Sequence, residues 1–190
     1  MILHSLHCHP DDTPPDLSVG VQAARTPAGD LRLIYHIQGA QHLIVPPLSP
    51  APGPRDNLWQ HTCCEAFIGA AQGTVDATDT ADTADTADTT YREFNFSPSG
   101  DWAAYAFIAY RERKADWPLS AAPRISTGQS AAAFLLSAEI PRALLPAAPW
   151  RLGLTFVAEA LDASKSHWAL AHAAARPDFH LAASFTLLLP

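Results

Sequence analysis

Alternating apolar and polar residues over Tyr91–Arg111 predict a β-hairpin. The segment Ser97–Gly100 separates the two halves of this stretch. Pro98 fixes the φ angle that the second position of a type I turn requires, and Gly100 can adopt the left-handed conformation that closes a three-residue loop. We therefore expect two antiparallel strands in which Ser97 pairs with Asp101.

This pairing gives the hairpin two unlike faces. The apolar face is expected to lie against the core and carries Phe94, Phe96, Trp102, Ala104, Ala106 and Ile108. The mixed face is expected to line a ligand site and carries Glu93, Asn95, Tyr105 and Arg111 beside Phe107. Because successive side chains of a strand point to opposite faces, a shift of one residue would exchange these assignments.

Further short apolar runs, separated by turn residues and by many of the 17 prolines, predict more strands. Pro141–Leu145 suits a single helical turn with proline at its first position. About ten strands with at most one or two helical turns indicate an all-β antiparallel sandwich, jelly-roll-like, in one domain over residues 1–190. Besides the hairpin, the expected strands span residues 2–9, 17–24, 31–38, 59–70, 131–140, 151–160, 165–171 and 184–189, with another beginning at 124.

The composition excludes several classes of protein. A hydrophobic content of 48% with only 16% charged residues excludes a disordered chain. The net charge is −7, but an Asp-Thr-Ala repeat holds five of the acidic residues, so the remainder is nearly neutral. Without a basic cluster, neither nucleic acid nor an anionic membrane is expected as a partner. The repeat cannot build a core, and we expect a mobile loop at about residues 71–90.

The N-terminal residues and the cysteines favour a cytoplasmic setting. The first twelve residues lack the basic start and apolar stretch of a signal peptide. No apolar run approaches the roughly 20 residues of a membrane span. Cys8, Cys63 and Cys64 are too few and too unevenly spaced for a disulfide framework.

Several short segments occur in an order that resembles a known family. They are Asp56–Trp59, Cys64–Ile68, Tyr91–Gly100, Glu139–Pro141 with Leu144, Trp168, and Pro177–His180 with Phe185. Together they resemble the DOMON-like superfamily, and within it the family-nine type of carbohydrate-binding module. The resemblance implies a β-sandwich with a ligand pocket on one sheet. Carbohydrate modules of this superfamily hold a sugar between aromatic rings, whereas other DOMON domains bind haem through Met and His.

The polar residues of the mixed face suit a saccharide. Sugars need planar polar groups that form two hydrogen bonds at once and a flat ring for stacking. A structural alternative is a buried salt-bridge network in which Arg111 offsets the two glutamates and fixes the register. Both readings remain open, and they are compatible with each other. The candidate ligand-binding residues are Trp59, Glu65, Glu93, Asn95, Tyr105, Arg111 and Trp168.

Other chemistries have weaker support. Two carboxylates on one face suggest glycoside hydrolysis, but an arginine close to both favours their ionised forms, which does not suit a general acid. No metal site is expected from His4, His7, Cys8 and His9, because no second half-site with zinc spacing follows. A structural calcium ion remains open. Haem could use His167, His172 or His180 as an axial ligand, but the chain has no internal Met for a Met–His pair.

The Pro177–His180 segment has two expected roles. Asp178 is expected to cap a turn, and Phe179 either plugs the end of the sandwich or lines the pocket. Taken together, the sequence predicts a non-catalytic module that binds a small polar ligand, with a saccharide as the expected ligand. The alternatives are a haem or redox-ligand domain and a purely structural or interaction module. The last alternative predicts that loops fill the mixed face and leave no cavity.

Overall fold

The computed structural model describes residues 2–71 and 90–190, and nearly all of their regular structure is β. The loop expected at about 71–90 lies almost entirely outside the described residues. The strands are β1 (Leu3–Cys8), β2 (Ser18–Arg25), β3 (Leu31–Gln38), β4 (Cys63–Ala70), β5 (Tyr91–Phe96), β6 (Trp102–Ala109), β7 (Glu112–Arg113), β8 (Arg124–Gln129), β9 (Ala133–Ile140), β10 (Trp150–Glu159), β11 (Lys165–Ala169) and β12 (Leu187–Leu189). Short 3₁₀ turns are η1 (Ala40–His42), η2 (Leu58–Gln60), η3 (Arg142–Leu144) and η4 (Ala182–Ser184).

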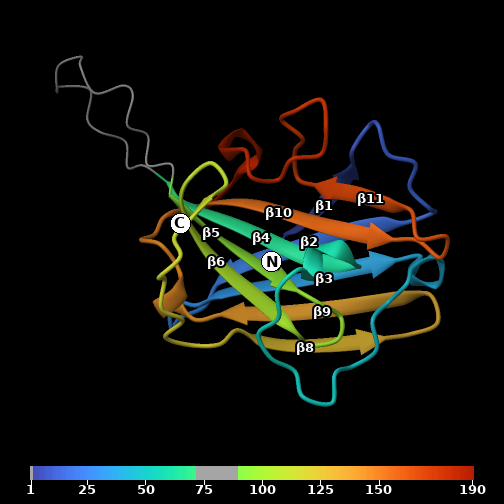
Figure 1. Cartoon of the computed structure of the whole chain (residues 1–190), viewed down its shortest axis with the longest axis horizontal. Helices are drawn as coiled ribbons and strands as arrows, with labels where there is room; N and C mark the ends of the chain where they lie inside the picture. The colour runs from blue at the N-terminus through green and yellow to red at the C-terminus, as the bar shows by residue number, and fades with distance from the viewer. Residues whose placement is uncertain (1, 72–89) are drawn as a thin grey trace.

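The strands form one continuous antiparallel sheet that folds back on itself into two layers (Figure 1). The order is β7-β6-β5-β4-β10-β11-β1-β2-β3-β9-β8, and β12 pairs with β10. Strand β1 joins the layers, because Leu3–Leu6 pair with β2 whereas His7 and Cys8 pair with β11. We call β2-β3-β9-β8 the first layer and β7-β6-β5-β4-β10-β11 the second layer. The all-β antiparallel sandwich is therefore confirmed, and its jelly-roll winding stays a prediction.

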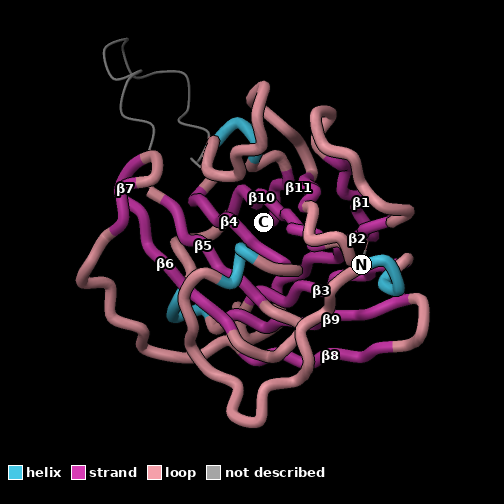
Figure 2. Tube along the Cα trace, turned by 45° about the vertical axis from the view of Figure 1, so that its right-hand side comes forward, coloured by secondary structure: helices cyan, strands magenta, loops and turns pink. Residues whose placement is uncertain are grey.

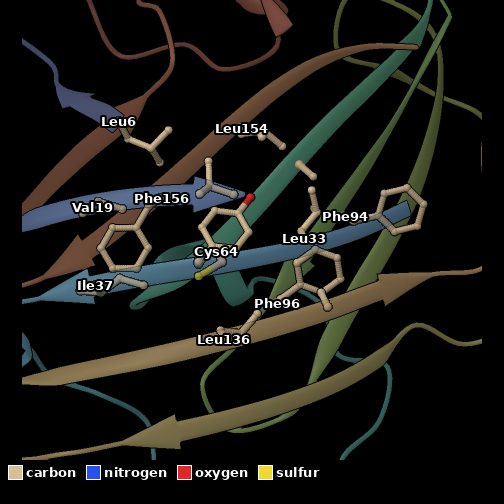
Figure 3. Close-up of a cluster of buried hydrophobic side chains, with 14 of the residues drawn as sticks. Leu6, Val19, Leu33, Ile37, Cys64, Phe94, Phe96, Leu136, Leu154 and Phe156 are labelled. Atoms are coloured by element: carbon tan, nitrogen blue, oxygen red, sulfur yellow. The ribbon is translucent and has the colours of Figure 1, made fainter. Parts of the chain in front are cut away.

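The main core lies between the two layers. Figure 3 shows its side chains converging from both layers, with Leu33, Ile37 and Leu136 from the first layer and Phe94 and Phe156 from the second. All five side chains are fully buried. The buried hydroxyl of Tyr35 also crosses this core and donates a hydrogen bond of 2.6 Å to the backbone oxygen of Glu65. Apolar burial between the layers is thus the main stabilisation of the fold.

The central hairpin has the register that its turn predicts. Phe96 lies opposite Trp102 and Glu93 lies opposite Tyr105. The backbone N–H of Ser97 donates to the oxygen of Asp101 at 2.9 Å. Gly100 has a φ of 88°, the left-handed conformation that the turn requires. The two faces of the hairpin are therefore assigned correctly over most of its length.

Ile108 is the exception on the apolar face. Its expected core position is wrong, because the side chain is 46% exposed. The last residue pair between β5 and β6 is Tyr91 with Phe107, so Ile108 lies beyond the part of the hairpin that faces the first layer. The register of β6 with β7 is also irregular between Phe107 and Ala109. Strict alternation does not extend through such an irregularity.

Strand predictions succeed best where alternation is long. The run Leu31–Gln38 has the expected bounds. The helical turn expected over Pro141–Leu145 is present as the 3₁₀ turn η3, with Pro141 as its N-cap. The strand expected over residues 59–70 begins only at Cys63, because η2 occupies its start and Asn57 before it has a left-handed φ of 63°. Figure 2 shows that the 3₁₀ turns are short and lie between strands. Elements of two or three residues, such as η1, η4 and β7, carry no period that a sequence pattern can reveal.

The second layer also buries part of its outer face, over which residues 170–186 pack. We call these residues, which lie between β11 and β12, the C-terminal segment. Phe67 on β4 stacks on Phe185 from this segment at 6.0 Å between ring centroids, and Phe179 lies 6.2 Å from Phe67. Tyr91 and Phe107 join the same cluster. This smaller outer core supports one wall of the pocket described below. Within the described residues, no helix is long and apolar enough to cross a membrane.

Gly153 on β10 provides the space that Phe185 fills, so a larger residue there should destabilise the protein. A Cβ at this position would lie 2.7 Å from Cδ1 of Phe185. We expect Gly153→Ala to lower the free energy of unfolding in urea by about 1–3 kcal/mol. Gly128→Ala on β8 is the matched control, since a Cβ there meets no atom within 4 Å. Equal effects of the two substitutions would contradict this role of Gly153.

Candidate functional site

A pocket of about 420 Å³ lies on the outer face of the second layer. This volume is within the range of small-molecule sites in proteins. Its lining comes from the mixed face of the hairpin, from η2, from β4, β10 and β11, and from the C-terminal segment. The mixed face is thus partly covered by a loop but keeps an open cavity, in contrast to the closed face that a purely structural module predicts.

The register of the sheet explains the floor of the pocket. Glu65 on β4 lies opposite Asn95 on β5 and opposite Thr155 on β10. Two residues along β4, Phe67 lies opposite Glu93. Residues that are paired across a sheet, or two apart along a strand, point to the same face. Two carboxyl groups from neighbouring strands therefore share the outer face with a phenyl ring.

Aromatic rings form much of the wall. Phe107 and Phe179 line the pocket together with Phe67. Trp59, held in η2, lies at the rim and is 49% exposed. Phe179 packs over the outer face of the second layer, so it lines the pocket and does not plug the end of the sandwich. An apolar wall with a few polar groups at the floor is typical of a small-molecule site.

Glu65 is the deepest acid of the pocket. Only 2% of the surface of Glu65 is exposed to solvent. Oε2 accepts a hydrogen bond of 3.3 Å from the hydroxyl of Thr155, whereas Oε1 is buried with no hydrogen-bond partner among the described residues. Burial raises the pKa of Glu65 well above its usual value, the charge of Glu93 raises it further, and the Thr155 hydrogen bond opposes both.

Glu93 is also buried, with 6% of its surface exposed. Its Oε1 accepts a hydrogen bond of 2.9 Å from Nδ2 of Asn95, and its Oε2 lies 3.9 Å from Nε2 of His180. Burial raises the pKa of Glu93, against the opposing effects of the Asn95 hydrogen bond and of Arg113 and Arg111. Asn95 itself is fully buried beside Glu93 and does not line the pocket, and its Oδ1 has no partner among the described residues.

Arg111 does not form the expected network with the two glutamates. It lies in the turn between β6 and β7, with a φ of 55°, and its guanidinium is paired with Asp178 at 3.0 Å. The expectation that this arginine keeps both acids ionised is wrong, because Arg111 has no part in the pKa shift of Glu65, and its lowering of the pKa of Glu93 is outweighed by burial. Arg111 still lines the mouth of the pocket, beside Arg113.

The seven candidate residues are only partly brought together. Trp59, Glu65, Glu93 and Arg111 line the pocket, and Asn95 supports Glu93 from beside it. Tyr105 lies next to the pocket. Its hydroxyl donates a hydrogen bond of 2.5 Å to Asp56, and Cζ of Arg113 lies over its ring, 3.5 Å from the ring centroid.

Trp168 is the candidate that the fold places elsewhere. It belongs to the core between the layers, and its Nε1 donates to the hydroxyl of Ser166 at 3.0 Å. Trp168 is therefore not available to stack on a ligand in this pocket. Its neighbour His167 points to the outer face instead, because adjacent residues of β11 alternate, and His167 lines the pocket.

His167 is a pocket residue that the sequence singled out only as a candidate haem ligand and not as a saccharide contact. Its backbone N–H and its Nδ1 lie 2.8 Å and 3.0 Å from Oδ2 of Asp12, in the loop after β1. In the neutral ring this contact assigns the proton to Nδ1 and leaves Nε2 as an acceptor. The alternation of β11, which separates His167 from Trp168, is the signal that would have identified it.

His180 is the second residue that the sequence singled out only for haem. Its Nδ1 lies 2.8 Å from the hydroxyl of Tyr91, which in turn accepts the backbone N–H of Arg111 at 3.1 Å. Tyr91 therefore donates to Nδ1, and the remaining ring proton of His180 lies on Nε2, toward Glu93. Burial, followed by the charge of Arg111, lowers the pKa of His180 to about 4, so the ring is neutral at pH 7. The backbone N–H of His180 donates to Asp178 at 3.0 Å, which confirms the predicted capping.

The N-terminal histidines do not assemble into a metal site in the part of the chain that the structure describes. Residues 2–71 and 90–190 contain no group of three or more His, Cys, Asp or Glu side chains that could hold a metal ion. His9 and His172 lie edge to face at 4.8 Å, and the Nε2 of His172 lies 2.8 Å from the backbone oxygen of His7. These rings thus connect β1 to the C-terminal segment.

Comparison with known proteins gives matches only among solved structures. No protein-family model and no curated protein matches the chain. A carbohydrate binding module family 9 from Caldicellulosiruptor kristjanssonii in complex with glucose matches with a TM-score of 0.49 and 8% identity, over 88% of this chain and 74% of that chain. The module in complex with cellotriose matches with a TM-score of 0.44 and 10% identity, over 88% and 72%. Both are modules of the family that the sequence resembles. The wider DOMON-like assignment stays a prediction.

Proposed function

We propose that this protein binds a small saccharide in the pocket on the outer face of the second layer, without catalysing a reaction. The observation that carries this proposal is Oε1 of Glu65, a buried acceptor at the floor of an aromatic-walled pocket with no partner in the described chain. A buried polar atom without a partner costs about 1–3 kcal/mol. A ligand hydroxyl that donates to this oxygen would remove that cost.

The other lining groups match the remaining needs of a sugar. One face of a sugar ring is rich in C–H groups and packs on an aromatic ring, for which Trp59 at the rim and Phe107 and Phe179 in the wall are available. Donors come from Arg111 and Arg113 at the mouth. His167 also lines the pocket, and in the neutral ring its Nε2 would accept a hydrogen bond. Hydroxyl groups both donate and accept, so a polyol can satisfy donors and acceptors together.

The alternatives are less well supported by the geometry. Haem would need an axial nitrogen inside the pocket. His172 does not line the pocket, and one ring nitrogen of His180 is engaged with Tyr91, which leaves His167 as the axial candidate for this alternative. A purely structural module has no use for a buried carboxyl oxygen, Oε1 of Glu65, that lacks a partner in the described chain at the floor of an open pocket. Hydrolysis keeps one supporting observation, because a carboxyl group whose pKa is raised by burial is what a general acid requires.

Calorimetric titration with glucose, xylose, cellobiose and cellotriose tests the proposal. We expect at least one saccharide to bind, and we expect Trp59→Ala to weaken that binding about tenfold or more through loss of the stacking ring. Trp117→Ala is the matched control, since Trp117 packs under Arg92 and does not line the pocket.

Two further measurements separate the alternatives. An NMR time course of the oligosaccharides with the protein would reveal new reducing ends, which would overturn the non-catalytic part of the proposal. A haem titration that gives a Soret band while no saccharide binds would favour the haem alternative. No binding of any saccharide, or equal effects of the two tryptophan substitutions, would count against saccharide recognition.

A further inference from the structure

Among the described residues, neither acid at the floor of the pocket forms a salt bridge with an arginine or a lysine, and the charges of Arg113 and Arg111 act on Glu93 only without such contact. The charge that acts on the carboxyl group of Glu65 comes from Glu93, another acid, and the hydrogen bond that this carboxyl group accepts within the described part of the chain comes from the neutral hydroxyl of Thr155. Glu93 in turn is hydrogen-bonded to the neutral amide of Asn95 and faces the neutral ring of His180. Buried acids are normally paired with a cation, so this arrangement is unusual for a finished structure.

The two arginines of the lining are engaged at the mouth. Arg111 is paired with Asp178 at 3.0 Å, and Arg113 lies on the ring of Tyr105 at 3.5 Å. In the order β7-β6-β5-β4, the backbone of Arg113 on β7 lies three strands from that of Glu65 on β4, or about 14 Å at the usual strand spacing. The pocket therefore has a cationic mouth and an acidic floor.

The wall around the acidic floor also suits a cation. Phe67, Phe107 and Phe179 line the same pocket as Glu65 and Glu93. The face of an aromatic ring attracts an ammonium group, and this attraction grows where water is excluded. Two carboxyl groups and several rings around one cavity are complementary to a group that carries positive charge and several N–H donors.

We propose that the saccharide is an amino sugar whose protonated amine binds at Glu65 and Glu93, against the aromatic wall. An ammonium group brings three donors. One can reach Oε1 of Glu65, which has no partner among the described residues, and another Oε2 of Glu93, whose contact with His180 is long at 3.9 Å. The sugar hydroxyls then lie toward the arginines of the mouth. This inference rests on the saccharide-binding function proposed above.

Calorimetry at pH 6.5 with four small ligands tests the inference. They are glucosamine, N-acetylglucosamine, glucose and cyclohexylamine, which vary the amine and the sugar ring independently. We expect glucosamine to bind about tenfold or more tightly than glucose, because its ammonium group would stabilise the ionised carboxylates that burial disfavours, and a hydrogen bond between ions is stronger than one between neutral groups. N-acetylglucosamine, which has lost the positive charge, is expected to bind no better than glucose.

The four ligands also distinguish failure of this inference from failure of the proposed function. If glucose or N-acetylglucosamine binds as tightly as glucosamine, saccharide binding stands and the amine site is overturned. If cyclohexylamine binds and no sugar does, the amine site stands and the saccharide function is overturned. If none of the four binds, the inference is overturned.

Substitutions then locate the preference. Glu65→Gln keeps the shape of the side chain and removes its charge, so the ratio of glucosamine to glucose affinity is expected to fall to about one. Asp162→Asn is the control, an exposed acid that does not line the pocket, and should leave the ratio unchanged. If thermal unfolding shows that Glu65→Gln is not folded, Glu93→Gln takes its place. An unchanged ratio in a folded variant of either glutamate overturns the inference.

Discussion

Replacing Phe94 with alanine is expected to lower the free energy of unfolding by about 3–5 kcal/mol, the usual range for a phenylalanine removed from a well-packed core. Phe94 is fully buried between the layers, where its ring stacks on that of Phe96 at 6.4 Å. It lies opposite Ala66 on β4 and Ala104 on β6, two small residues that cannot fill the space it would leave. Urea unfolding followed by circular dichroism measures the loss.

Trp59→Ala is the matched comparison for Phe94→Ala. It also removes an aromatic ring, but from a side chain that is 49% exposed at the rim of the pocket. We expect it to change the free energy of unfolding by less than about 1 kcal/mol. If both substitutions destabilise the protein equally, the assignment of one face of the hairpin to the core and the other to the pocket is wrong.

The fold could be predicted from the sequence because its signals are local. A proline and a glycine in the turn of the central hairpin fix the loop, and the loop fixes the register of β5 against β6. Alternation then assigns the faces of β3, β4 and β5. The prediction of Ile108 failed because the irregular pairing of β6 with β7 depends on a partner strand of only two residues.

The site could be predicted only in part, because its walls come from segments far apart in the sequence. Glu65 and Glu93 follow from two strands that each have a clear period. Phe179 and His180 reach the pocket only because the C-terminal segment packs on the outer face, and no local pattern specifies where that segment lies. The prediction that Arg111 pairs with the two glutamates failed for the same reason, because its actual partner Asp178 belongs to this segment.

The two faces of the second layer divide the tasks of stability and recognition. The inner face is occupied by large apolar side chains whose only function is burial. The outer face keeps acids that burial disfavours, which is common where a protein holds a binding site at some expense of stability. These acids should therefore make the free energy of unfolding depend on pH.

Glu65→Gln is expected to stabilise the protein at high pH, in contrast to most substitutions of buried residues. Burial raises the pKa of Glu65 in the folded state above its value in the unfolded state. The folded state then binds more protons than the unfolded state, so the free energy of unfolding falls as the pH rises from about 4.5 through the folded pKa. Glutamine does not ionise, so the free energy of unfolding of the variant lacks this decrease with pH.

The measurement is urea unfolding of the wild type and the variant at several pH values between 4 and 8. We expect their stabilities to be similar at pH 4 and the variant to gain about 1–3 kcal/mol relative to the wild type by pH 8. His180 has the opposite effect, because its lowered pKa reduces stability as the pH falls below 6.5, but this contribution is present in both proteins and cancels in the difference.

Asp162→Asn provides a control of opposite sign. Hydrogen bonds from Ser164 lower the pKa of Asp162 in the folded state below the usual value of about 3.8. The variant should therefore lose stability relative to the wild type as the pH rises through about 3.8, and it should gain none at higher pH. A difference between Glu65→Gln and the wild type that stays constant from pH 4 to 8 would show that the Glu65 carboxyl group is not held in a buried, cation-free site. The physical basis of the acidic floor, and with it the proposed amine contact, would then be lost.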